Sequence, residues 1–174
     1  MPRVLVLHMA LVLGLAAPGC ATAESRQAKP RPVMATVLSI GDGDTLRVRR
    51  NGSSLTVRLA CIDAPELAQR PNGAQARAYL RKRLAIGTPV RLLVKSSDHN
   101  GRVVAEVIGA INLGLALVED GEAFVSRRHV DQCDAAAYLA AEARARRRRR
   151  GVWQVPGGID RPWQFRRSRD TKGS

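Results

Sequence analysis

The sequence lacks the groupings of histidine and cysteine that hold zinc. Only three His and three Cys occur among its 174 residues, and no cluster of them has the spacing of a zinc site. Acidic residues are also scarce, because 15 Asp and Glu stand against 29 Lys and Arg, for a formal charge of +14. This excess favours a polyanionic partner, nucleic acid ahead of an anionic membrane surface or wall polymer. Composition alone leaves open a basic protein whose charges are simply solvated.

The sequence has no apolar run of the length that spans a bilayer as an ordinary transmembrane helix. Residues 1–23 instead have the pattern of a secretory signal, in which the apolar run 4–17 is followed by the small residues 21–23. We therefore expect export to the periplasm or the cell exterior, with a mature chain that begins near Glu24, carries a charge of +13 and has no stable membrane span. An uncleaved anchor, or a lipid anchor at Cys20, is the less favoured alternative.

The mature chain is long enough for one domain with a real core, and we expect a monomer. Residues 24–32 are polar and contain proline, which predicts a flexible lead-in. The folded domain is expected over residues 33–153. A basic, flexible tail is expected over residues 154–174, where Trp163 and Phe165 are the side chains available to dock it onto the domain.

Neither an internal repeat nor an alternation of strands and helices is visible, so the pattern does not favour a repeat protein or a doubly wound sheet. Asn51-Gly52 separates two β-branched stretches and predicts a tight hairpin. The expected strands are 35–40, 45–50, 55–62, 90–94 and 102–108, and the expected helices are 73–84, 112–119 and 134–150. This order predicts a β-rich α+β fold, a five-stranded Greek-key barrel of the OB type with three helices.

Two corners of the chain carry carboxylates. Asp42 and Asp44 lie in the turn Gly41–Thr45, and Asp63 and Glu66 flank an Ala-Pro pair in the stretch LACIDAPE. Each corner alone reads as an ordinary solvated turn. Together, in a basic chain, they predict a hard-cation site built from oxygen ligands, suited to Ca²⁺, with Mg²⁺ possible on the same chemistry.

Two arginines are candidates for the same site. Arg58 interrupts an apolar strand, where a charge is costly unless it is paired or faces a cleft. A structural ion pair is its simpler role, and Arg102, after the Asn100-Gly101 turn, reads equally well as an exposed turn charge. In one continuous strand Arg58 and Asp63 point to opposite faces, so their spacing alone does not build a site.

These motifs, in this order, resemble the staphylococcal nuclease (thermonuclease) family. The resemblance is carried by Ile40 to Thr45, by Val57 to Glu66 and by Asp98 to Arg102, and it spans residues 33–153. It implies an OB-type barrel and a Ca²⁺-dependent phosphodiesterase that acts on single-stranded or denatured DNA and on RNA. Its products would carry 3′-phosphates.

The resemblance also implies a role for each candidate residue. Asp44 and Asp63 would bind Ca²⁺ with their carboxylates, and Ala64 would add its carbonyl. Asp42 would lie next to these ligands without binding the metal directly. Glu66 would be the general base on the attacking water. The phosphate would be held by Arg58 and Arg102, because a guanidinium can give two hydrogen bonds to phosphate oxygens.

The chain departs from the family pattern at its aromatic positions. His99 and Asn100 stand where the family commonly has a basic residue and a Tyr, and Arg127 stands at the other flanking aromatic position. These losses remove base stacking, so the base preference and the handling of strand ends are not expected to follow the family. The rival hypothesis is a catalytically inert OB module that only binds nucleic acid or another polyanion.

The two cysteines of the expected mature chain, Cys61 and Cys133, are predicted to form a disulfide. Export would place them in an oxidising compartment. In the family fold, the strand position of Cys61 lies close to the start of the last helix, where Cys133 falls. The alternative is a buried free thiol at Cys61 and an incidental Cys133.

Overall fold

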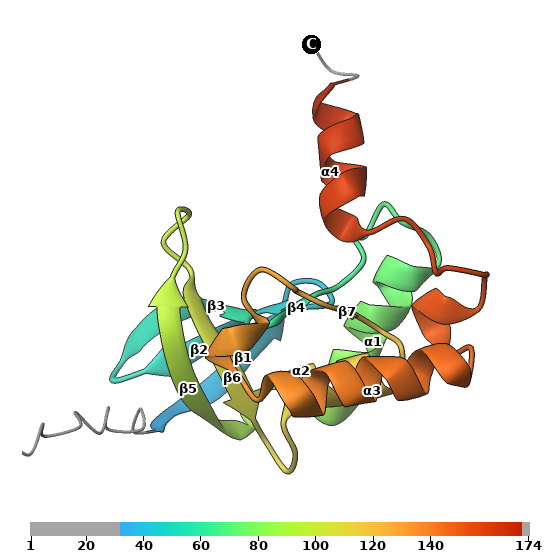
Figure 1. The fold of residues 1–174 in the computed structure, drawn as a ribbon. Helices are drawn as coiled ribbons and strands as arrows, with labels where there is room; N and C mark the ends of the chain where they lie inside the picture. Colours follow the sequence, from blue (N-terminus) through green and yellow to red (C-terminus); the bar gives the residue numbers. More distant parts are fainter. Residues whose placement is uncertain (1–31, 172–174) are drawn as a thin grey trace, which may run out of the picture.

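The computed structural model describes residues 32–171, whose core is a closed barrel (Figure 1). Its strands follow each other around the barrel in the order β1-β2-β3-β6-β5. All neighbours pair antiparallel except β3 and β6, which pair parallel. The bounds are β1 Val33–Ile40, β2 Thr45–Arg50, β3 Ser53–Leu59, β5 Pro89–Ser97 and β6 Val103–Ile108. The predicted five-stranded barrel is thus confirmed.

The barrel forms because alternate strand residues are apolar and face inward. Val37, Leu46 and Val57, from three adjacent strands, are fully buried in one core. Asn51 and Gly52 have φ angles of 48° and 80°, so the tight hairpin between β2 and β3 is confirmed.

Three helices lie where the sequence predicts them, packed beside the barrel: α1 Asn72–Arg83, α2 Leu113–Glu119 and α3 Ala135–Arg147. The Asn112 side chain caps α2 and the Asp134 side chain caps α3, each by accepting a backbone N–H from the first turn. α3 ends three residues before the expected Arg150, because Arg149 adopts a left-handed φ of 50° that a helix cannot contain.

The expected strand 55–62 is wrong at its end, because β3 stops at Leu59. Cys61 has a φ of 67°, which turns the chain out of the barrel. The chain then forms β4 (Ile62–Asp63), which pairs with β7 (Phe124–Val125) in a separate two-stranded sheet. The bend is linked to the start of α3 by a disulfide between Cys61 and Cys133, as predicted.

The largest departure from expectation is a fourth helix, α4 (Pro162–Asp170), within the stretch expected to be a flexible tail. Figure 1 shows α4 projecting from the body formed by the barrel and α1–α3. Pro162 stands at its first position, where proline's missing N–H and fixed φ suit a helix start. The three-helix count is therefore wrong by one.

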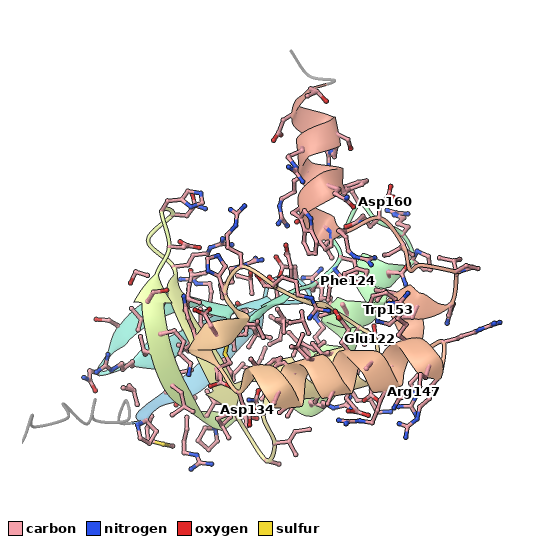
Figure 2. The ribbon with its side chains drawn as sticks, in the orientation of Figure 1. Glu122, Phe124, Asp134, Arg147, Trp153 and Asp160 are labelled. Carbon is pink, nitrogen blue, oxygen red and sulfur yellow. A yellow bond between two sulfur atoms is a disulfide. The ribbon has the colours of Figure 1, made fainter. Side chains whose placement is uncertain are left out.

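α4 is attached through a small second apolar cluster. Phe124 and Trp153 meet edge to face with centroids 5.1 Å apart, and Trp163 meets Phe124 in the same way at 6.4 Å. Figure 2 shows Phe124 and Trp153 below Asp160, where the chain enters α4. Trp163 therefore docks the helix, as the sequence suggests.

No helix within residues 32–171 is long and apolar enough to cross a membrane. The expected signal at residues 1–23, the possible lipid anchor at Cys20 and most of the lead-in 24–32 lie outside the described residues.

Candidate active site

All the residues singled out for chemistry line one cleft of about 1160 Å³. It opens between the ends of the barrel strands, the β4–α1 loop and α4. The sequence candidates found in its wall are Asp42, Asp44, Arg58, Asp63, Ala64, Glu66 and Arg102. His99, Asn100 and Arg127, the three positions at which the chain departs from the family pattern, line it as well.

Arg58 joins the two acidic corners. Its Nη1 lies 2.9 Å from Asp44 Oδ1 and its Nη2 lies 2.7 Å from Asp63 Oδ1. In one continuous strand Arg58 and Asp63 would point to opposite faces, but the strand is broken between β3 and β4. The turn at Cys61 brings Asp63 back to the face that carries Arg58. A single guanidinium thus spans both carboxylates.

Asp44 is the most buried acid of the cleft, with 3% of its surface exposed. Burial raises its pKa to about 6, even though Arg58 lowers it, and the charges of Asp42 and Asp63 raise it further. Its Oδ2 accepts the backbone N–H of Ala64 at 2.9 Å. The carboxylate therefore lies against the LACIDAPE corner, shielded from water.

The turn Gly41–Thr45 is pressed against that corner. Asp42 Oδ1 accepts the backbone N–H of Asp44, so Asp42 shapes the turn. A Cβ at Gly43 would lie 2.7 Å from the Cβ atoms of both Ala64 and Ala76, closer than carbon atoms approach. Glycine is needed here because any side chain would push the two corners apart.

Glu66 is held through its backbone. Its N–H donates to Gln69 Oε1 at 2.9 Å, and its carbonyl accepts the N–H of Gln69. A Cβ at Gly73 would lie 2.0 Å from the Glu66 carbonyl oxygen, so the start of α1 packs directly on Glu66. The side chain is left half-exposed toward the cleft.

Arg102 reaches the cleft from the turn between β5 and β6. Asp98 Oδ1 accepts the backbone N–H groups of Asn100 and Arg102, and Asp98 Oδ2 lies 2.7 Å from Arg102 Nε. Asp98 therefore fixes both the turn and the guanidinium. No contact between Arg102 and the acids near Arg58 is among those described for residues 32–171.

Arg127 does more than replace an aromatic ring. Its guanidinium pairs with Glu142 of α3, a buried acid that also accepts the backbone N–H of Val125 in β7. Arg127 thus ties the cleft wall to α3.

Sequence reasoning missed Arg166. This residue of α4 lies with Nη2 2.6 Å from Asp63 Oδ2 and with Nη1 against Glu66 Oε1. The two carboxylates raise the pKa of its guanidinium above the ordinary arginine value. Pro162 followed by Trp163, Arg166, Arg167 and Asp170 at helical spacing was the available signal, since these four residues line the cleft together.

The donor set suits a hard cation. Asp44 and Asp63 supply carboxylate oxygens within the span of one guanidinium, and the peptide of Ala64 adjoins Asp44. No three His, Cys, Asp or Glu side chains between residues 32 and 171 are grouped closely enough to hold a metal ion. A cation here would therefore take its remaining ligands from main-chain carbonyls and water, which Ca²⁺ and Mg²⁺ accept.

The match to known proteins agrees with this geometry. Residues 56–155, more than half of the chain, match the family described as staphylococcal nuclease homologue. The chain belongs to the staphylococcal nuclease family. A micrococcal nuclease of Shigella flexneri is 34% identical over 142 residues, which cover 76% of this chain and 79% of that protein.

Two further relatives cover similar shares. An endonuclease of Haemophilus influenzae, described as uncharacterized, is 35% identical over 75% of this chain and 71% of its own length. Protein ParB of Escherichia coli is 30% identical over 78% of this chain and 80% of its own length. Membership of the staphylococcal nuclease family supports a nuclease with nucleic acid as its substrate.

Proposed function

We propose that the protein is an exported, Ca²⁺-dependent nuclease that hydrolyses phosphodiester bonds of single-stranded or denatured DNA and of RNA, leaving 3′-phosphates. The observation that carries the proposal is Arg58 spanning Asp44 and Asp63, with Glu66 in the same cleft wall. A surface that only bound a polyanion would gain nothing from carboxylates such as Asp44, Asp63 and Glu66 in the wall of its binding cleft.

Asp44, Asp63 and the carbonyl of Ala64 would hold the cation, and Asp42 would keep the turn of Asp44 in place. When bound, Ca²⁺ would supply positive charge beside the scissile phosphate, which repels an incoming nucleophile. Burial of the two carboxylates suits this role, because a weakly hydrated pair gains most from a dication.

Glu66 is the group placed to take a proton from the attacking water. The water oxygen would bond to phosphorus while the bond from phosphorus to the 5′-oxygen breaks, and the leaving oxygen would take a proton from solvent. Arg58 and Arg102 would stabilise the negative charge that grows on the phosphate oxygens. Their planar forks suit that charge better than an ammonium group would.

The deciding experiment incubates the purified mature protein with denatured DNA and with RNA, in Ca²⁺, in Mg²⁺ or in a chelator. Cleavage in Ca²⁺ alone, with phosphate on the 3′ ends of the products, is the expected result. Products with 3′-hydroxyls, or equal rates in chelator, would contradict the proposed chemistry.

The second candidate function is an inert nucleic-acid-binding module. One observation favours it: Arg166 pairs with both Asp63 and Glu66, the acids that catalysis would need. Under this alternative, folded protein supplied with Ca²⁺ would bind single-stranded DNA and cleave neither substrate.

A further inference from the structure

Arg166 makes contacts that are incompatible with the roles proposed for its two partners. Its guanidinium takes both oxygens of Asp63, at 3.2 and 2.6 Å, and also contacts Glu66. A carboxylate fully engaged with a guanidinium has few lone pairs left for a cation, and a Glu66 oxygen that accepts a hydrogen bond from Arg166 is not free to accept a proton from water. The working site therefore has to displace Arg166.

The attachment of α4 permits such a displacement. The helix has nine residues and is anchored at its start, where Trp163 meets Phe124 edge to face, the Arg161 guanidinium lies over the Phe124 and Trp153 rings, and Gln69 donates a hydrogen bond to the Asp160 carbonyl. Arg166 lies about one turn beyond this anchor. The Arg166 side chain is 41% exposed. Its ion pair with the half-exposed Glu66 contributes little stability. Its pair with Asp63, whose side chain is only 8% exposed, can be replaced because a dication attracts a poorly hydrated carboxylate more strongly than one guanidinium does.

A displaced Arg166 has one other class of anion within reach. Trp163, Arg166 and Arg167 lie on the α4 face that lines the cleft, across which Arg58 and Arg102 also lie. A guanidinium released from the carboxylates would remain in that wall, where a substrate phosphate would enter. Bidentate pairing suits phosphate as well as it suits carboxylate.

We propose that Arg166 is a third phosphate-binding arginine of this nuclease, held on Asp63 and Glu66 until a divalent cation takes those carboxylates. The inference rests on the proposed function, because it needs a cation site at Asp44 and Asp63. It makes α4 both a competitor of the cation and a contributor to substrate binding. Occupancy by the cation then prepares the cleft for the phosphate.

The test compares Arg166→Gln with Arg169→Gln, a matched control. Arg169 lies on the same helix, carries the same charge and stands over the Phe165 ring, and it has no described contact with Asp63 or Glu66. Calorimetry first measures Ca²⁺ affinity without nucleotide. We expect Arg166→Gln to bind Ca²⁺ about tenfold more tightly than the wild type, and Arg169→Gln to change the affinity by less than about threefold.

The second measurement is the affinity, at saturating Ca²⁺, for a mononucleotide phosphorylated on both its 3′ and 5′ oxygens, which has no diester bond to cleave. We expect the effect of Arg166→Gln on nucleotide affinity to be opposite to its effect on Ca²⁺ affinity. This variant should bind the nucleotide about tenfold more weakly than the wild type, whereas Arg169→Gln should bind it about as tightly as the wild type. A merely structural Arg166 would not move the two affinities in opposite directions.

Unchanged Ca²⁺ affinity in Arg166→Gln, or unchanged nucleotide affinity, would overturn the inference while leaving the nuclease proposal intact. Equal effects of Arg166→Gln and Arg169→Gln on the two affinities would also overturn it, because the loss of one positive charge from α4 would then explain the effects of both variants. Failure of the wild type and of both variants to bind Ca²⁺ would remove the inference together with the proposed cation site.

Discussion

The cleft has a barrel wall, formed at the ends of the barrel strands, and a helical wall, formed by α4, and the two are built in different ways. Asp44 and Arg58 lie at the ends of barrel strands, where backbone ladders and the packed core hold them. Arg166 lies on a short helix that is anchored near its start by the ring of Trp163, by the Arg161 guanidinium over two rings and by polar contacts. Chemistry that depends on sub-ångström placement belongs on the first wall, and contacts that must break and reform belong on the second. Four predictions test this division.

The largest effect is expected at the rim of the barrel wall. Glu66→Gln should lower turnover by about 10²–10⁴-fold, because an amide accepts no proton. Its Ca²⁺ affinity should change far less than that of Asp44→Asn, which removes a proposed ligand. Steady-state rates at saturating Ca²⁺, with calorimetry of each variant, separate the two effects. Turnover within tenfold of the wild type would remove Glu66 as the base.

The next effect concerns the bend that carries Asp63. The disulfide closes a loop with a sequence separation of 72 residues. In the chain-entropy model its loss should lower the free energy of unfolding by about 4 kcal/mol, close to 10³-fold in the folding equilibrium. Denaturant unfolding of the double variant Cys61→Ala/Cys133→Ala measures this. Reduced wild-type protein is the control. If the free energy of unfolding falls by less than about 1 kcal/mol in both proteins, the bend at Cys61 does not depend on the disulfide for its stability.

A smaller effect follows from the buried Asp44. Its pKa of about 6, against an ordinary value of 3.8, means that protons compete with a cation at higher pH than for an exposed Asp. Ca²⁺ affinity should be constant well above pH 6 and should fall about tenfold per unit as the pH drops below 6. Calorimetry from pH 8 to pH 5 tests the sign. A Ca²⁺ affinity that stays constant down to pH 5 would show that Asp44 titrates normally.

The smallest effect is expected on the helical wall. With chelator present, where Arg166 is held by the carboxylates, Arg167→Gln should reduce the salt dependence of single-stranded DNA binding. The slope of log K against log salt should shrink by about 0.7 for one lost phosphate contact. Arg147→Gln, at the end of α3 and not among the residues that line the cleft, should leave the slope nearly unchanged. Equal slopes in the two variants would show that α4 does not meet the strand.

Much of the barrel wall could be predicted because its signals are local. Alternating β-branched residues, the Asn51-Gly52 turn and the capping side chains Asn112 and Asp134 specify elements within a few residues of themselves. The motifs around Asp44 and Asp63 identified the candidate acids, and the charge of Arg58 inside an apolar strand marked it as a residue that had to be paired or to face a cleft. The end of β3 was missed because a positive φ at Cys61 has no signature in a non-glycine residue.

By itself, the sequence determined which side chains were available: a basic chain, two acidic corners, two candidate arginines and two cysteines in the expected mature chain. Only the tertiary structure decided which of them meet. The turn at Cys61 brings Asp63 to Arg58, and the packing of Trp163 on Phe124 brings Arg166 to Glu66 across 100 residues of chain. The reason is physical, because an ion pair between distant residues depends on the path of the whole backbone between them and leaves no periodicity at either end.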